Sequence, residues 1–289
     1  MYADFDLVIA ETLDEVLAAL GEANGAGATL PLAGGTNMIV DLRARRVTPE
    51  RLVALGKLDA LRGIRIDGGR VRMGARTTMT DILQHPGLAE HAPSLVEQAR
   101  VFGGQMVRNA ATVAGNICSG SPAADVVPPL LALDAEVTLA SASGTRVLPL
   151  GEFFLGYKQD ARAPGELMTE IAWDLPPANS NNRFYKLALR KGDAITVVGI
   201  AVALTVEAGA CTRARIALGA VAPVVKRATA AEAMLSGQSL TPELIDAAAR
   251  QAVDDVDPID DIRASAEYRR HCVHALTRRL VTQAWQSLS

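Results

Sequence analysis

Cysteine is scarce in this chain of 289 residues, whose three thiols, Cys118, Cys211 and Cys272, lie far apart and form no Cys-x-x-Cys pair. Zinc sites and iron–sulfur clusters need closely spaced thiolate or imidazole ligands. His271 and His274 have a ligand-like spacing, but they stand in a segment dense in arginine, which disfavours a bound cation. We therefore expect no metal site and no iron–sulfur cluster in this chain.

Other absences exclude further classes of protein. The formal net charge is −3 and long blocks of one charge are missing, so the basic stripe that nucleic-acid binding needs is absent. The longest apolar stretch, 195–206, is shorter than the roughly 18 residues of a membrane-spanning helix. The first six residues lack the features of a secretory signal. We expect a cytoplasmic protein with no nucleic-acid partner and no integral membrane segment.

The length and composition that are present indicate two globular domains. A chain of 289 residues exceeds the roughly 100 to 200 residues of an average domain. Hydrophobic residues make up 49% and charged residues 21%, which is typical of folded proteins. Residues 175–182 are rich in proline, serine and asparagine, as linkers are. The sequence thus predicts domains at 1–177 and 178–289.

Local patterns predict a mixture of helices and strands. A capping box at Thr12 and Glu15 predicts a helix at 12–23. The other elements predicted for the first domain are a strand at 29–33, hairpins at 62–75 and around 141–144, and helices at 78–83, 93–99 and 125–133. For the second domain we predict strands near 183–190, 195–206 and 211–221, then helices from about 228, 242 and 264.

Two loops of small residues are candidates for ligand binding. Residues 32–37 read Leu-Ala-Gly-Gly-Thr-Asn and follow a predicted strand, while 108–117 hold a second such loop. Glycines let the main chain approach a ligand, and consecutive N–H groups suit a pyrophosphate. Neither loop has the Gly-x-Gly-x-x-Gly pattern of a Rossmann fold. Either loop alone is more often an ordinary turn.

Six pieces of the sequence occur in a fixed order along nearly the whole chain. They are residues 32–37, 74–78 (Gly-Ala-Arg-Thr-Thr), 107–121, 121–125 (Ser-Pro-Ala-Ala-Asp), 153–157 (Phe-Phe-Leu-Gly-Tyr) and 190–194 (Arg-Lys-Gly-Asp-Ala). Together they resemble the FAD-binding medium subunits of the molybdenum hydroxylases, the family of xanthine dehydrogenase and carbon monoxide dehydrogenase. The resemblance implies an α+β FAD-binding domain of the vanillyl-alcohol oxidase, or PCMH, type with subdomains at about 1–57 and 58–177. A C-terminal α/β domain of the CO dehydrogenase flavoprotein type would follow at 178–289.

The resemblance also implies that FAD is bound noncovalently. The implied contacts are Leu32, Ala33, Gly34, Gly35, Thr36, Asn37, Phe102, Thr112, Ala114, Gly115, Asn116, Asp125, Leu167 and Lys186. The N–H groups of 32–37 would bind the pyrophosphate, with the Thr36 hydroxyl as a further donor. Thr112 and Asn116 would hold phosphate or ribityl oxygens. Many relatives carry another residue in place of Asn37, so the role of its side chain stays open.

The remaining contacts are implied one at a time. Phe102 would line the cofactor channel, Leu167 would contact the adenine, and Asp125 would hydrogen-bond the adenosine ribose. Lys186 would lie near the flavin, where a cation favours the anionic reduced ring. The residues alone leave two alternatives open: Asp125 as the N-cap of the helix that follows, and Lys186 facing solvent on a strand.

We predict no catalytic residue, because none of the four histidines lies in either loop and a flavin that only exchanges electrons needs no protein base. The resemblance implies partners: a small subunit with [2Fe-2S] clusters and a large subunit with molybdopterin, in a dimer of heterotrimers. Electrons would pass through FAD to an external acceptor. Two alternatives are a free-standing FAD oxidoreductase with its own organic substrate, and an accessory protein that has lost its flavin.

Overall fold

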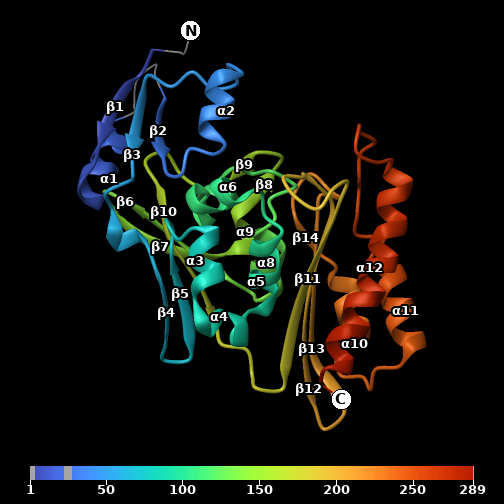
Figure 1. Ribbon diagram of the computed structural model, residues 1–289. Helices are drawn as coiled ribbons and strands as arrows, with labels where there is room; N and C mark the ends of the chain where they lie inside the picture. The colour runs from blue at the N-terminus through green and yellow to red at the C-terminus, as the bar shows by residue number, and fades with distance from the viewer. Residues whose placement is uncertain (1–3, 23–27, 289) are drawn as a thin grey trace.

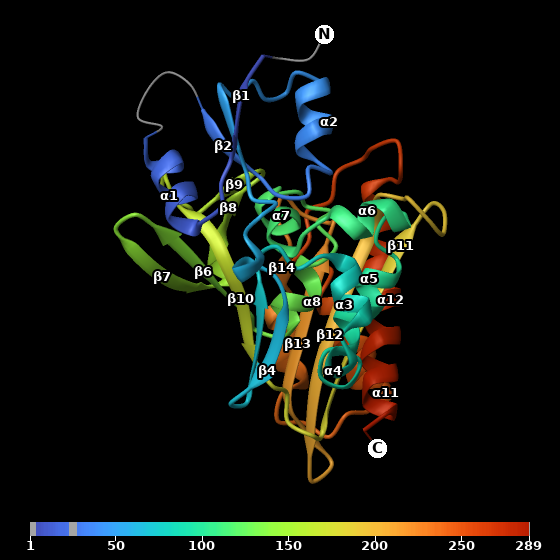
Figure 2. The ribbon, with the colours of Figure 1, turned by 60° about the vertical axis from the view of Figure 1, so that its left-hand side comes forward.

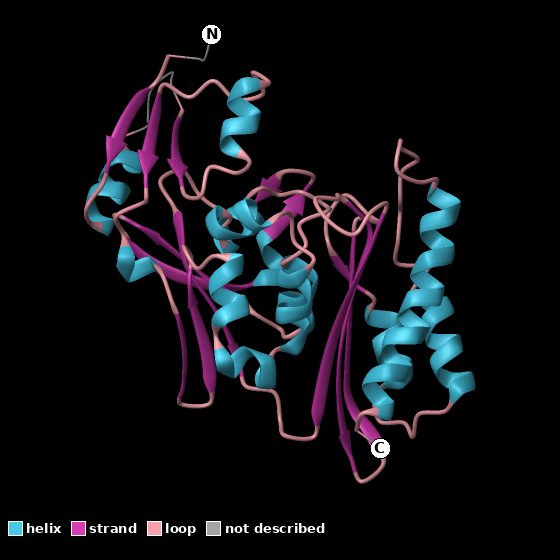
Figure 3. Ribbon diagram, in the orientation of Figure 1, coloured by secondary structure: helices cyan, strands magenta, loops and turns pink. Residues whose placement is uncertain are grey.

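The computed structural model describes residues 4–22 and 28–288, which form alternating layers of sheet and helix (Figures 1 and 3). A small parallel sheet lies near the N-terminus, with strand order β1-β3-β2. Its strands are β1 (Asp6–Ile9), β2 (Thr29–Leu32) and β3 (Arg51–Ala54). Parallel neighbours need crossovers, and helices α1 (Leu13–Gly21) and α2 (Met38–Arg43) supply them.

A five-stranded antiparallel sheet forms the next layer, with order β4-β5-β10-β6-β7. Its strands are β4 (Ile64–Asp67), β5 (Arg70–Gly74), β6 (Glu136–Ser141), β7 (Gly144–Pro149) and β10 (Leu167–Asp174). The accompanying elements are the 3-10 turn η1 (Asp59–Leu61), helices α3 (Met79–Gln84), α4 (Pro86–His91), α5 (Pro93–Arg100), α6 (Gln105–Ala110), α7 (Val113–Cys118), α8 (Val127–Ala132) and α9 (Leu150–Phe153), and the hairpin of β8 (Phe154–Gly156) and β9 (Gln159–Asp160).

The C-terminal region, residues 180–288, is a four-stranded antiparallel sheet covered by helices. The strands pair in chain order: β11 (Ser180–Ala188), β12 (Thr196–Glu207), β13 (Ala210–Gly219) and β14 (Lys226–Arg227). Helices α10 (Thr229–Leu235), α11 (Pro242–Gln251) and α12 (Ala266–Gln286) cover one face, and α5 and α8 of the N-terminal region contact the other (Figure 2). Among the described helices, none is long and apolar enough to cross a membrane.

Burial on both faces explains why β12 is an apolar run rather than an alternating strand. Val198, Ile200 and Val202 belong to the core beneath α10, α11 and α12. Ala201 points the other way, into the core of the N-terminal region. Phe184 of β11 joins that same core. The hydrophobic core therefore continues from one region into the other, and this contact fixes where the two regions meet.

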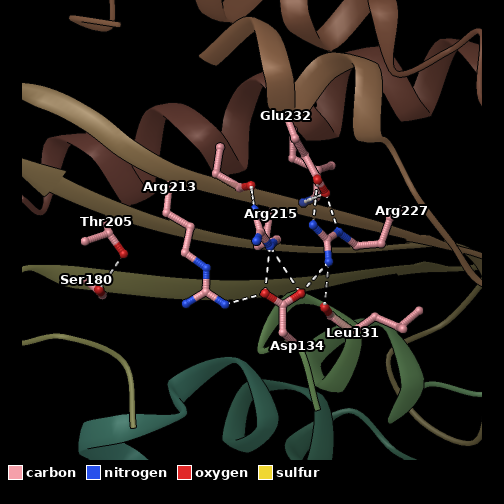
Figure 4. A network of polar contacts seen from close by, with 10 residues as sticks. Leu131, Asp134, Ser180, Thr205, Arg213, Arg215, Arg227 and Glu232 are labelled. Carbon is pink, nitrogen blue, oxygen red and sulfur yellow. Dashed lines mark hydrogen bonds and ion pairs between the residues drawn. The ribbon is translucent and has the colours of Figure 1, made fainter. Parts of the chain in front are cut away.

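A cluster of charged side chains also joins the two regions (Figure 4). Asp134 follows α8 and accepts hydrogen bonds from Arg213, from Arg215 at 2.8 Å and from Arg227 at 2.6 Å. Arg227 also pairs with the buried carboxylate of Glu232 on α10. One carboxylate of the N-terminal region thus holds three guanidinium groups of β13 and β14.

The structure contains the predicted helices and strands with shifted ends. The stretch 108–117, predicted as a loop of small residues, instead belongs mostly to helices α6 and α7. No residue of α6 is buried, so it carries no apolar pattern to detect. The helix predicted at 125–133 begins at Val127, and Val126 is its N-cap. The alternative of Asp125 as an N-cap is therefore wrong.

We predict that Asp134→Asn weakens the joint between the two regions. Asparagine tolerates the positive φ of 52° at this position, but it removes the charge that faces the three arginines. Because the cluster is partly exposed, we expect a loss of about 1 kcal/mol in the free energy of unfolding by urea. Asp174→Asn, which affects an exposed pair with Arg70, is the control and should change little. An unchanged urea midpoint for Asp134→Asn would contradict a stabilising role for the cluster.

Candidate functional site

A cavity of about 1200 Å³ lies between the N-terminal and C-terminal regions. Small-molecule sites usually have about 300 to 1,000 Å³, so this one suits a large ligand. The N-terminal region contributes the loop after β2, the segment from α6 to α7 and the β8–β9 hairpin. The C-terminal region contributes the start of β12, the segment 220–223 and residues in 257–269.

The walls of the cavity carry more positive than negative charge. Six cationic side chains line it, against three carboxylates. The cations are Arg46, Arg76, Lys158, Arg162, Arg263 and Arg269, and the carboxylates are Asp41, Asp257 and Asp261. A concave site with such a surplus attracts an anionic ligand.

Most of the residues predicted to contact FAD line this one cavity, although they come from distant parts of the chain. Those that line it are Ala33, Gly34, Gly35, Thr36, Asn37, Phe102, Thr112, Ala114, Gly115, Asn116 and Leu167. Leu32, Asp125 and Lys186 are not among its lining residues. Leu32 lies behind the first loop, at the end of β2, and its carbonyl accepts a hydrogen bond from the Leu55 N–H at 2.9 Å.

The first loop, residues 33–37, presents main-chain donors that the protein itself leaves unused. In the described part of the chain, no partner is found for the N–H groups of residues 34–38. Gly35 turns the chain with a φ of +70°. Gly34 is needed for packing, because a Cβ there would lie 1.8 Å from the Ala110 carbonyl oxygen. The two small-residue loops therefore touch each other at Gly34.

The second loop uses its main-chain donors internally. The Val113 N–H donates to the Thr77 carbonyl at 2.9 Å, and the Ala114 N–H donates to the Ala75 carbonyl at 3.2 Å. Thr112 Oγ1 caps α7 by accepting from the Gly115 N–H at 3.1 Å. The Asn116 N–H, in turn, donates to the Thr112 carbonyl. Of the two loops, both within the described residues, only the first has a row of N–H groups without a partner, and its residues line the cavity.

Arg76 adds a buried donor to the cavity wall. Its Nη2 donates to the Gly56 carbonyl at 2.6 Å, which fixes the side chain. Its Nη1 is buried without a hydrogen-bond partner among the described residues, and the nearest carboxylate oxygen, from the exposed Asp59, lies 3.6 Å away. A buried guanidinium nitrogen without a partner is costly, so a ligand that accepts a hydrogen bond there is favoured.

Asp125 and Lys186 lie together behind the cavity wall. Lys186 Nζ donates to Asp125 Oδ2 at 2.6 Å, and both side chains are more than nine-tenths buried. The hydroxyl of Thr196, which lines the cavity, donates to Asp125 Oδ1. The alternative of Lys186 facing solvent is therefore wrong. The structure brings Asp125 and Lys186 next to the cavity without exposing either side chain to it.

The buried side chain of Arg269 holds the C-terminal wall in place. Its guanidinium donates to the Val197 carbonyl at 2.6 Å, the Ala220 carbonyl at 3.0 Å and Asp261 Oδ1 at 2.8 Å. Desolvation alone would raise the pKa of Asp261, but the N–H groups of Arg263 and Ala264 and the Arg269 guanidinium lower it to about 2. Asp261 is thus ionised at neutral pH and anchors the loop to α12.

The described lining of the cavity contains no histidine and one cysteine, Cys118. Burial raises the pKa of the Cys118 thiol to about 11, so this thiol is neutral at pH 7 and a poor nucleophile. The walls can bind and orient a ligand.

The sequence does not single out Arg76, Thr196, Asp261 or Arg269. Of these four residues, only Arg76 lies in one of the six pieces that carry the family resemblance, Gly-Ala-Arg-Thr-Thr at 74–78. Thr196 is hidden inside an apolar strand, and Arg269 is one of several arginines on α12. Their roles depend on contacts between segments that are far apart in the sequence.

We predict that alanine is tolerated less well at Gly34 than at Gly35. The Cβ of Gly34→Ala would overlap the Ala110 carbonyl, and such overpacking costs about 1 to 3 kcal/mol or more. The Cβ of Gly35→Ala meets only ordinary contacts at 3.5 and 3.6 Å, leaving about 1 kcal/mol of backbone strain. Urea unfolding of both variants checks the order. A larger loss for Gly35→Ala would mean that the two loops do not touch at Gly34.

Two protein families match the chain. Residues 3–176 match the FAD binding domain in molybdopterin dehydrogenase. Residues 183–284 match the CO dehydrogenase flavoprotein C-terminal domain. The chain is also 34% identical over 281 residues to the nicotinate dehydrogenase FAD-subunit of Eubacterium barkeri, covering 96% of this chain and 95% of the relative. The carbon monoxide dehydrogenase medium chain of Hydrogenophaga pseudoflava is 31% identical over 281 residues, covering 97% of each.

Solved structures show the same arrangement. Carbon monoxide dehydrogenase from Hydrogenophaga pseudoflava, in a form that lacks the Mo-pyranopterin moiety, has a chain that superposes with a TM-score of 0.95 at 32% identity over 99% of both chains. Quinoline 2-oxidoreductase from Pseudomonas putida 86 gives 0.92 at 27% identity over 100% of this chain and 99% of that one. The predicted fold class, an α+β FAD-binding domain followed by a flavoprotein C-terminal domain, is confirmed. The chain belongs to the family of FAD-binding medium subunits of the molybdenum hydroxylases.

Proposed function

We propose that this chain binds one FAD noncovalently in the cavity and passes electrons from a partner's [2Fe-2S] cluster to an external acceptor. The observation that carries the proposal is the row of N–H groups at residues 34–38, which have no partner in the described part of the chain. They belong to a cavity with a surplus of cations. A pyrophosphate is the anion that suits such a row of donors.

The protein's own part is to bind and orient the cofactor. We propose that residues 34–38 and Arg76 Nη1 donate to the pyrophosphate, and that Thr36 and Asn116 add side-chain donors. Phe102 and Leu167 supply apolar contact area on the cavity wall. When bound, FAD supplies the electron chemistry itself. The neutral Cys118 thiol and the lack of a histidine among the described lining residues support a noncovalent cofactor.

We further propose two partner subunits, a small one with [2Fe-2S] clusters and a large one with molybdopterin, assembled as a dimer of heterotrimers. The support is that this chain spans nearly the full length of relatives that are themselves a FAD-subunit and a medium chain of dehydrogenases. The free cysteines Cys118, Cys211 and Cys272 do not form a ligand set. We also propose that the domain boundary lies at 177/178, between β10 and β11.

The test is electron transfer to the chain with and without partners. The full chain loaded with FAD should release all its yellow colour on acid precipitation, and anaerobic dithionite should bleach it. Purines, aldehydes and N-heterocycles should leave it yellow, because in this proposal electrons reach the flavin only through the partner subunits. Addition of the iron–sulfur and molybdenum subunits with their substrate should then bleach it.

Two outcomes would count against this function. Colour that stays with the acid pellet would show a covalent flavin. Reduction of the lone chain by an organic compound at a catalytically useful rate would show a free-standing FAD oxidoreductase instead.

A further inference from the structure

Three buried side chains form a relay of contacts that ends at the cavity wall. Lys186 Nζ donates to Asp125 Oδ2 at 2.6 Å, and the Thr196 hydroxyl donates to Asp125 Oδ1. Asp125 comes from the N-terminal region, whereas Lys186 lies on β11 and Thr196 on β12. Of the three, only Thr196 lines the cavity. Asp125 is buried and does not line the cavity, so the contact through which it reaches the cavity wall is its hydrogen bond with Thr196.

The relay fixes the direction of the Thr196 hydroxyl. An ionised carboxylate only accepts hydrogen bonds, so the single Thr196 proton points at Asp125. Burial raises the pKa of Asp125, while the Lys186 ammonium and the Thr196 hydroxyl both stabilise the charged form. Because the Thr196 hydroxyl donates its one proton to Asp125, its oxygen can offer only lone pairs to a ligand in the cavity. It can accept a hydrogen bond from a ligand but cannot donate one.

The backbone around Thr196 is held in place as well. The pairing of β11 with β12 slips from Leu187 opposite Val198 to Ala188 opposite Thr196, which is a β-bulge. A bulge redirects a side chain and frees a main-chain group. The Val197 carbonyl accepts from Arg269 at 2.6 Å, so this buried group is satisfied from α12. The acceptor at Thr196 is thereby held by both regions of the protein.

We propose that Thr196 accepts a hydrogen bond from an N–H of the isoalloxazine ring or from a ribityl hydroxyl of the bound FAD. Asp125 and Lys186 are positioning residues that act through Thr196. This inference rests on the proposed FAD function. The family resemblance implied a ribose contact for Asp125 and a direct flavin contact for Lys186. In this proposal both residues instead hold the Thr196 hydroxyl in position.

The first test compares Thr196→Val with Thr196→Ser in the full chain. Valine keeps the shape but removes the hydroxyl, and we expect FAD to bind about two- to tenfold more weakly. Serine keeps the hydroxyl and should restore the wild-type affinity. A shift in the visible spectrum or midpoint potential of the bound flavin would assign the donor to the ring, whereas a loss of affinity alone would assign it to the ribityl chain.

A matched control lies on the same strand. Thr205 is also buried, and its hydroxyl pairs with that of Ser180 at 2.8 Å (Figure 4). Neither residue lines the cavity. Thr205→Val should lower the melting temperature without changing FAD affinity or the flavin spectrum. A purely structural role for Thr196 would make the two valine variants alike.

The second test is a double-mutant cycle with Asp125→Asn. The amide can donate to Thr196 and turn its proton toward the cavity, so FAD affinity should fall in the wild-type background. In the Thr196→Val background the same change should have no further effect, because coupled residues are not additive.

Each failure has a distinct meaning. An equal loss on Asp125→Asn in both backgrounds would overturn the proposal, since Asp125 would then contact FAD directly. Wild-type affinity and spectrum in Thr196→Val would also overturn it, even if Asp125→Asn does not fold. A wild-type chain that binds no FAD would refute the proposed function instead.

Discussion

The burial of β12 on both faces is the constraint on which the site depends. One face packs beneath α10, α11 and α12, and the other joins the core of the N-terminal region. Because this strand cannot shift without opening one of two cores, its first residue, Thr196, stays at the cavity wall. Asp134 and the three arginines around it reinforce the same joint from the protein surface. The cavity is thus a product of the contact between the two regions.

The two small-residue loops divide the work at the cavity. The unpaired N–H groups are those of residues 34–38, in and just after the first loop. The second loop, at 108–117, donates N–H groups of its own to Ala75, Thr77 and Thr112. The second loop therefore acts mainly as a support: Ala110 packs against Gly34, and Thr112 caps α7. The surplus of cations on the walls and Arg76 Nη1, which has no hydrogen-bond partner among the described residues, complete a site suited to an anionic ligand.

Much of the fold could be predicted from the sequence, because local signals specify it. Thr12 caps α1 by accepting from the Glu15 N–H, although the Glu15 carboxylate accepts from the Glu11 N–H and so does not complete the predicted capping box. The Gly68-Gly69 turn closes the β4–β5 hairpin. The apolar run 195–206 predicts β12, since a strand covered on both faces has no polar side. Helix α6 could not be predicted from apolar periodicity, because none of its residues is buried.

The sequence could predict only those parts of the site that consist of residues adjacent in the chain. Residues 33–37 form such a motif, and the structure places them on the cavity wall. Asp125, Lys186 and Thr196 become partners only when β11 and β12 fold against the N-terminal region, and no spacing in the sequence encodes that contact. The family resemblance implies Asp125 and Lys186 as cofactor contacts, but their link to Thr196 arises only from three-dimensional packing.

The most direct measurement of the central claim is a crystal structure of the chain with bound FAD. The account predicts that the pyrophosphate lies within hydrogen-bond distance of the N–H groups of residues 34–38, and that the cofactor runs from there toward Thr196 in the C-terminal wall. FAD bound elsewhere, or a pyrophosphate that contacts the 112–116 loop and leaves the N–H groups of 34–38 unpaired, would contradict it.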